Sequence, residues 1–130
     1  MAGTFKFELV TPERMALSQD AAQVVVPGVE GDFTVLAGHA PVISALRPGI
    51  IDVTLPDASK TRIFVKGGFA EVDAGHLTVL AERALDVEAM DAATIAAELE
   101  TAQADLASAT DDAGRLAAAS AVERLQGLGR

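Results

Sequence analysis

The hydrophobic pattern of the chain changes its period near Leu85, and this change limits the folds that are open to it. Before this residue, apolar side chains recur at every second position, as in Phe5, Phe7 and Leu9. A period of two is typical of a strand with one buried face. Further strand-like segments are 23–26, 33–36, 50–55, 62–66, 69–73 and 76–80. Turn-forming Gly, Pro and Asp residues separate them at intervals of roughly eight to twelve residues, which predicts an antiparallel β-sandwich or barrel.

The part that follows Leu85 is rich in Ala, Glu, Leu and Gln, which have high helix propensity. Apolar residues there recur with the spacing of one helix face, and segment 108–112 offers N-caps for a second helix. The two predicted apolar stripes are Ile95, Leu99, Ala102 and Leu106, then Leu116, Ala119, Val122 and Leu125. Two helices with a short connection form an antiparallel hairpin. Its alanine-rich stripe is thin, so we expect the hairpin to be the less stable part.

Together, the two patterns predict an α+β protein with two domains. Residues 1–85 form the β-sandwich domain, and residues 86–130 form the helical hairpin domain.

The chain is acidic, with a formal net charge of −9. Residues 1–85 hold 7 basic against 10 acidic side chains, and residues 86–130 hold 3 against 9. A nucleic-acid partner is disfavoured, because binding to phosphates needs a cationic surface. There is no cysteine, which excludes disulfides and thiolate chemistry. The N-terminus lacks the pattern of a signal peptide, and we expect a soluble, cytoplasmic chain without direct membrane insertion.

Catalytic equipment is not evident in the sequence. His39 and His76 fall in different predicted turns without metal-ligand spacing, so we expect no metal site. The residue types of a nucleophilic triad are present in Ser44, His39 and Asp32, but no Gly-x-Ser-x-Gly elbow surrounds Ser44. Gly67-Gly68 lacks the remainder of a phosphate-binding loop and is interpreted as a bend between strands. We therefore expect no catalytic residues.

The segment from Gly31 to Gly49 is the least ordinary part of the chain, because it is apolar, punctuated by glycine and almost uncharged. A buried strand, a loop and a second core segment account for it. So does a non-polar patch at residues 40–46 that docks on another protein. The residues alone leave both interpretations open.

This segment closely resembles the signature of the epsilon-subunit family of F-type ATP synthases. The matching residues are Gly31-Asp-Phe-Thr-Val-Leu-Ala-Gly-His-Ala-Pro41 and Arg47-Pro-Gly49. Further matches are Gly67-Gly-Phe-Ala-Glu-Val72, Thr78-Val-Leu-Ala81, Phe5-x-Phe-x-Leu-Val10 and Pro12-Glu-Arg14. The resemblance covers the whole chain, strongly through residue 81 and loosely after it.

The resemblance implies a flattened N-terminal antiparallel β-sandwich and a C-terminal two-helix hairpin. It also implies a non-catalytic rotor subunit that links the gamma subunit to the c-ring and couples proton flow to ATP synthesis. Such a subunit lies on the cytoplasmic face of the inner membrane as a peripheral protein. Contacts of the hairpin with the alpha and beta subunits are a further implication.

Interface residues follow from the resemblance by position. The c-ring-facing residues are Glu30, Gly31 and Asp32, with His39 expected in the same turn region. The gamma-facing residues are Thr11, Ala16, Leu17, Ser44 and Val79. A carboxylate at Asp32 suits the Arg and Gln side chains that polar loops of c subunits often present.

The hairpin departs from the family pattern. Many members carry Leu/Ile-Asp-x-x-Arg-Ala at the start of the first helix, where it contributes to ATP binding. Here Asp91 is retained, but Thr94 and Ile95 stand in place of the Arg and Ala. Arg115 and Arg124 are the remaining candidates for a weak phosphate contact. We expect no bound cofactor, feeble ATP binding and feeble inhibition of hydrolysis, because the inhibitory helices of the family are basic and this one is not.

Overall fold

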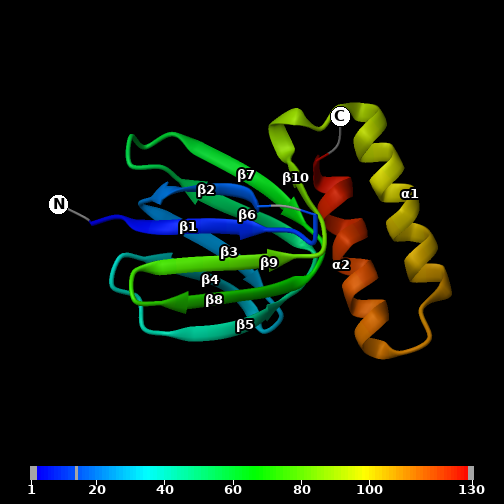
Figure 1. The fold of residues 1–130 in the computed structure, drawn as a ribbon. Coiled ribbons are helices and arrows are strands. Elements are labelled where there is room, and N and C mark those ends of the chain that lie inside the picture. Colours follow the sequence, from blue (N-terminus) through cyan, green and yellow to red (C-terminus); the bar gives the residue numbers. More distant parts are fainter. Residues whose placement is uncertain (1–2, 14, 129–130) are drawn as a thin grey trace.

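The computed structural model describes residues 3–13 and 15–128, in which a β-sandwich is followed by two helices (Figure 1). The strands are β1 (Phe5–Val10), β2 (Met15–Ala21), β3 (Gln23–Gly28), β4 (Gly31–Leu36), β5 (Val42–Leu46), β6 (Gly49–Thr54), β7 (Lys60–Val65), β8 (Gly68–Asp73), β9 (His76–Ala81) and β10 (Ala84–Asp86). A 3-10 turn, η1 (Val87–Ala89), leads into α1 (Ala92–Ser108) and α2 (Asp112–Leu128). The predicted sandwich and hairpin are both confirmed.

The strands form two layers that are joined at one corner. Hydrogen bonding follows the order β10-β7-β6-β3-β5-β8-β9-β1-β2, and β4 pairs with β3. A single pair, Gly28 with Leu46, links β3 to β5, so that β10-β7-β6-β3-β4 lies over β5-β8-β9-β1-β2. Every pairing is antiparallel except that of β1 with β9, which is parallel. This exception places the start of the chain beside the last long strand.

Three strands lie outside the segments that the sequence pattern identified. Strand β2 contains no β-branched residue, and its pairing with β1 stabilises it instead. Strand β5 is apolar at nearly every position, so it shows no alternation. Strand β10 has three residues, which is too short for a period to be read. All three depend on a partner strand.

The main core fills the space between the two layers. Phe7, Val24, Ile51 and Leu77 are among its fully buried side chains. A second cluster lies on the outer face of β6 and β7, where Phe64 packs with buried residues of both helices. The hairpin is therefore folded against the sandwich, and Figure 1 shows α1 and α2 side by side at one end of the strands.

The starts of both helices agree with the sequence prediction, but one of the two predicted apolar stripes does not. Asp91 caps α1, and Asp111 accepts a hydrogen bond from the Gly114 amide at the start of α2. In α1 the predicted stripe faces inward. In α2 the predicted stripe is only half correct, because Leu116 and Ala119 are exposed. The buried residues of α2 are Ala118, Ala121 and Leu125. Small side chains occupy this face because close helix packing requires them.

The bend predicted at Gly67-Gly68 is present. Both glycines have positive φ, at 78° and 117°, and Gly68 opens β8. No helix in the described part of the chain is long and apolar enough to cross a membrane.

Candidate functional site

The turn between β3 and β4 carries three of the four residues expected to face the c-ring. Glu30, Gly31 and Asp32 are all exposed at its tip. Gly31 has a φ of 131°, which a residue with a side chain rarely adopts. The Asp32 carboxylate is not free, because its Oδ1 accepts a hydrogen bond from Arg47 Nη2 at 2.6 Å. We call residues 28–32 the hairpin tip; the name refers to the β3–β4 hairpin and not to the helical hairpin of α1 and α2.

His39 does not share this turn, contrary to the sequence prediction. It lies in the β4–β5 connection, where its amide donates to the Leu36 carbonyl at 3.1 Å. Leu36 pairs with Gln23, at the end of β4 opposite to Gly31. The length of a six-residue strand, about 20 Å, therefore separates the two ends. Closeness in sequence was misleading, because the intervening residues are extended.

The residues expected to face gamma do not form one surface. Val79 is fully buried in the main core, so that its side chain cannot contact another subunit. Leu17 packs against that core, and Ser44 lies on the inward side of β5, opposite buried Ala70. Thr11 lines a cleft described below. The side chain of Ala16 lies outside the described residues.

A continuous apolar row crosses the outer face of the β5-β8-β9-β1-β2 layer. The paired positions are Ala45, Phe69, Leu80, Val10 and Met15, one from each strand in register. Phe69, Leu80 and Met15 are 53–55% exposed, and the nearby Ile43 is 69% exposed. An apolar patch of this kind is typical of a protein–protein interface. We call these five residues the outer apolar row.

The sequence pattern missed this row, although it contains the signal. Along each strand every second residue faces the core, and the row consists of apolar residues at the intervening, outward-facing positions. Phe69 is out of phase with Ala70, and Leu80 is out of phase with Val79. Such residues suggest a strand with two covered faces, but only the register shows that they align across five strands.

The row continues into an open cleft of about 830 Å³ between the sandwich and α2. Val10, Phe69 and Leu80 line one side of the cleft, and Ala117 and Ala121 line the other. The apolar surface therefore extends from the sheet face to the hairpin.

The three candidates for a nucleotide contact do not gather at one place, because Arg115 lies far from Asp91. Asp91 Oδ1 accepts a hydrogen bond from the Thr94 amide at 2.8 Å, and this bond lowers the pKa of Asp91 below its usual value. Arg115 is paired with Asp112 at 3.0 Å near the start of α2. Because the helices are antiparallel, Arg115 and Asp91 lie at opposite ends of the hairpin, about 25 Å apart for a 17-residue helix. Arg124 lies near the end of α2, at the same end of the hairpin as Asp91, and no ion pair joins these two described side chains.

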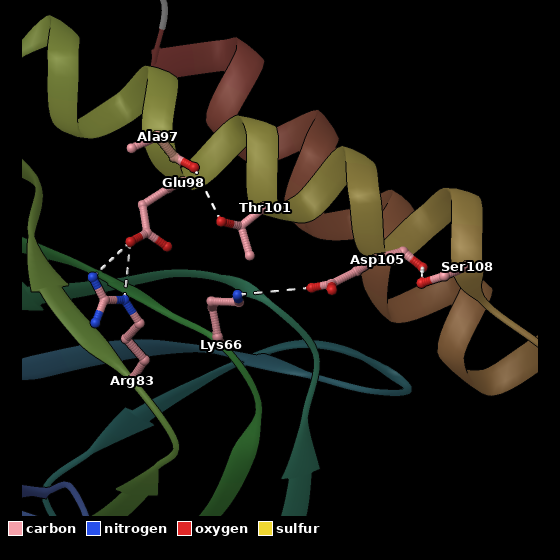
Figure 2. Close-up of polar contacts among 7 residues, drawn as sticks. All are labelled: Lys66, Arg83, Ala97, Glu98, Thr101, Asp105 and Ser108. Carbon is pink, nitrogen blue, oxygen red and sulfur yellow. Dashed lines mark hydrogen bonds and ion pairs between the residues drawn. The ribbon is translucent and has the colours of Figure 1, made fainter.

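Ionic contacts hold the hairpin on the sandwich (Figure 2). Arg83 donates from Nε and Nη2 to one oxygen of Glu98, at 3.0 and 2.6 Å. Glu98 is 8% exposed, and its partner therefore compensates a nearly buried charge. Lys66 lies 4.0 Å from Asp105 further along α1. We call the Arg83–Glu98 pair the latch.

The triad-like residues are each engaged elsewhere. Ser44 Oγ donates to the Ala45 carbonyl, and His39 Nδ1 lies 2.6 Å from the Ala40 carbonyl. Asp32 is bound to Arg47. Across residues 3–13 and 15–128, no three metal-binding side chains gather at one place.

Comparisons with known proteins identify the family of the chain. The family model described as ATP synthase, Delta/Epsilon chain, beta-sandwich domain matches residues 4–87. The ATP synthase epsilon chain of Parvibaculum lavamentivorans is 46% identical, over 98% of this chain and 97% of its own length. That of Maricaulis maris is 45% identical, over 98% and 96%. A chain in the cryo-EM structure of the Euglena gracilis mitochondrial ATP synthase OSCP/F1/c-ring superposes with a TM-score of 0.74 at 28% identity, covering 96% of this chain and 79% of that one. The chain belongs to the ATP synthase epsilon chain family, as a non-catalytic subunit of the rotary complex.

Proposed function

We propose that this chain is a coupling element of the ATP synthase rotor, which binds gamma through its outer apolar row and the c-ring through the hairpin tip. The row carries the proposal, because it is an exposed apolar surface on a rigid two-layer core. Close packing between the layers makes the sandwich stiff, as the transmission of torque requires. As a peripheral subunit of this complex, the chain is expected at the cytoplasmic face of the inner membrane.

The row replaces most of the positions first expected to face gamma. Thr11 alone of the described set lines the cleft into which the row extends. Gamma is thus expected to cover Phe69 and Leu80 and to reach into the cleft beside α2. Burial of large side chains at the centre of such a patch supplies most of the binding energy.

Replacing Leu80 with aspartate tests the gamma-binding surface. The substitution removes an exposed apolar side chain and would bury a charge in the interface, so the affinity for gamma falls by at least about thirtyfold. The measurement is a titration of an N-terminally labelled chain with an F1 sector that lacks this subunit.

Leu36→Asp is the matched control, because Leu36 is also about half exposed but lies on β4 in the other layer. It is expected to bind gamma normally. Equal affinities of Leu80→Asp and wild type would show that gamma binds elsewhere.

The hairpin is proposed to be a weakened regulator that is held down by the latch rather than by ATP. Thr94 supplies no guanidinium at the position of the family arginine, and its amide is already bound by Asp91. Arg115 is too distant to complete a site with Asp91. The latch instead joins the hairpin to the sandwich with residues of the chain itself. These observations support feeble ATP binding and feeble inhibition.

Replacing Arg83 with glutamine is expected to loosen the hairpin, and ATP is expected not to tighten it again. Glu98 loses its partner, which costs about 1–3 kcal/mol for a nearly buried acceptor. Hydrogen exchange of the α1 amides, with and without ATP, measures both effects. In the reassembled synthase the rate of ATP hydrolysis stays close to that of the wild type, although the hairpin is released.

Lys66→Gln provides the control at the same interface, because its ion pair is longer and partly exposed. It is expected to change α1 exchange little. Protection restored by micromolar ATP would contradict the absence of a nucleotide site. Strong inhibition of hydrolysis by Arg83→Gln would contradict the weakened regulator.

A further inference from the structure

We infer that Arg47 is the positioning residue of the c-ring-facing surface, and that Asp32 acts inside the chain while Glu30 is the carboxylate presented to the ring. The inference rests on the proposed contact between the hairpin tip and the c-ring. It also changes the role first expected for Asp32.

Arg47 reaches the hairpin tip from the corner at which the chain crosses between the layers. Its guanidinium donates from Nη2 to Asp32 Oδ1 at 2.6 Å and from Nη1 to the Gly28 carbonyl. The two acceptors lie on opposite strands of the turn, β3 and β4. One planar side chain therefore bridges the base of the turn.

Backbone hydrogen bonds attach the same two segments. The Arg47 amide donates to the Pro27 carbonyl at 3.0 Å, and the Val29 amide donates to the Ala45 carbonyl at 2.9 Å. The residues before and after Leu46 thus bind the residues before and after Gly28, where β3 ends. With the guanidinium in place, three hydrogen bonds join the tip to this corner and a fourth joins the preceding Pro27, so the turn is held in one orientation.

The arrangement assigns different tasks to the two carboxylates. The carboxylate of Asp32, which is 49% exposed, is paired with the guanidinium of Arg47, which is 26% exposed. Glu30 is exposed at the turn and has no hydrogen-bond or ion-pair partner among the described residues. A cationic or amide side chain of a c subunit would therefore meet Glu30 rather than Asp32. An acceptor on an ordered turn binds with less loss of entropy than one on a mobile loop.

Hydrogen exchange in the isolated, full-length chain tests the positioning role without the ring. Arg47→Gln is expected to speed exchange of the tip amides about tenfold, while amides of the core strands keep their protection. Arg62→Gln is the matched control, because Arg62 also pairs with an exposed carboxylate but lies on β7. Arg47→Lys retains part of the protection and Arg47→Met does not. Unchanged exchange in Arg47→Gln, or equal behaviour of the Lys and Met variants, would overturn the inference.

A double-mutant cycle on ring binding separates the two carboxylates. Asp32→Asn is expected to weaken binding to a synthase that lacks this subunit by a few fold, and to add nothing in the Arg47→Gln background. Glu30→Gln weakens binding about tenfold with unchanged exchange at the tip. A full effect of Asp32→Asn in the Arg47→Gln background would show that Asp32 itself touches the ring. If Arg47→Gln loosens the tip while both Glu30→Gln and Arg47→Gln bind normally, the ring contact lies elsewhere and the ordering role of Arg47 stands.

Discussion

Replacing Gly68 with alanine is expected to destabilise the sandwich severely, by about 3 kcal/mol or more. Gly68 has a φ of 117°, and an added Cβ would lie 1.8 Å from the Leu80 carbonyl oxygen. That oxygen belongs to the backbone of β9, the strand paired with β8, so it cannot move without breaking the ladder. Urea unfolding, followed by circular dichroism, measures the loss.

Gly75→Ala is the control for the effect of backbone conformation alone. Gly75 has a φ of 82°, but an added Cβ would meet nothing within 4 Å. We expect a loss of about 1 kcal/mol, from the left-handed conformation only. Similar losses for the two variants would mean that the contact with Leu80 is relieved by a movement of the strand.

Replacing Phe64 with alanine is expected to reduce the free energy of unfolding by about 3–5 kcal/mol and to undock the hairpin. Its side chain is fully buried on the outer face of β7, in the cluster that includes Ile95, Ala121 and Leu125. Removal of the ring leaves a cavity between the sheet and both helices. Urea unfolding measures the stability, and limited proteolysis of α1 and α2 measures the undocking.

Phe69→Ala is the control, because Phe69 is 55% exposed on the outer face of the other layer. Its loss is expected to change stability by no more than about 0.5 kcal/mol. A hairpin that stays protected in Phe64→Ala would show that the latch holds it on the sandwich without the aromatic ring.

Much of the fold could be predicted from local patterns. The period of two in β1, β3, β6, β8 and β9 follows from the burial of one strand face, and the N-caps at Asp91 and Asp111 follow from local hydrogen bonding. Helix faces were harder, since Leu116 and Ala119 fit a helical spacing as well as Ala118 and Ala121 do. Periodicity predicts that a helix has an apolar stripe, but the element that packs against the helix determines which stripe is buried.

The candidate site was less predictable, because it consists of residues that are distant in sequence. The outer apolar row takes one residue from each of five strands, and their alignment depends on register. Val79 is small and apolar, as an interface residue can be, yet it is buried in the core. Its neighbour Leu80 is exposed, because successive residues of a strand face opposite sides of the sheet. Arg47 and Asp32 are likewise 15 residues apart in the sequence, and they meet because the β3–β4 turn lies beside the corner that follows β5.

The amino-acid sequence was enough to predict a strand-rich part up to about Leu85 and an acidic helical part after it, because local period and propensity differ across that point. It also determined the family, through motifs between Gly31 and Ala81. The three-dimensional fold was needed to show which apolar side chains face outward together, that Arg47 binds Asp32, and that Arg83 holds Glu98 against the sandwich. These are contacts between elements, and their energy depends on distances that no local pattern contains.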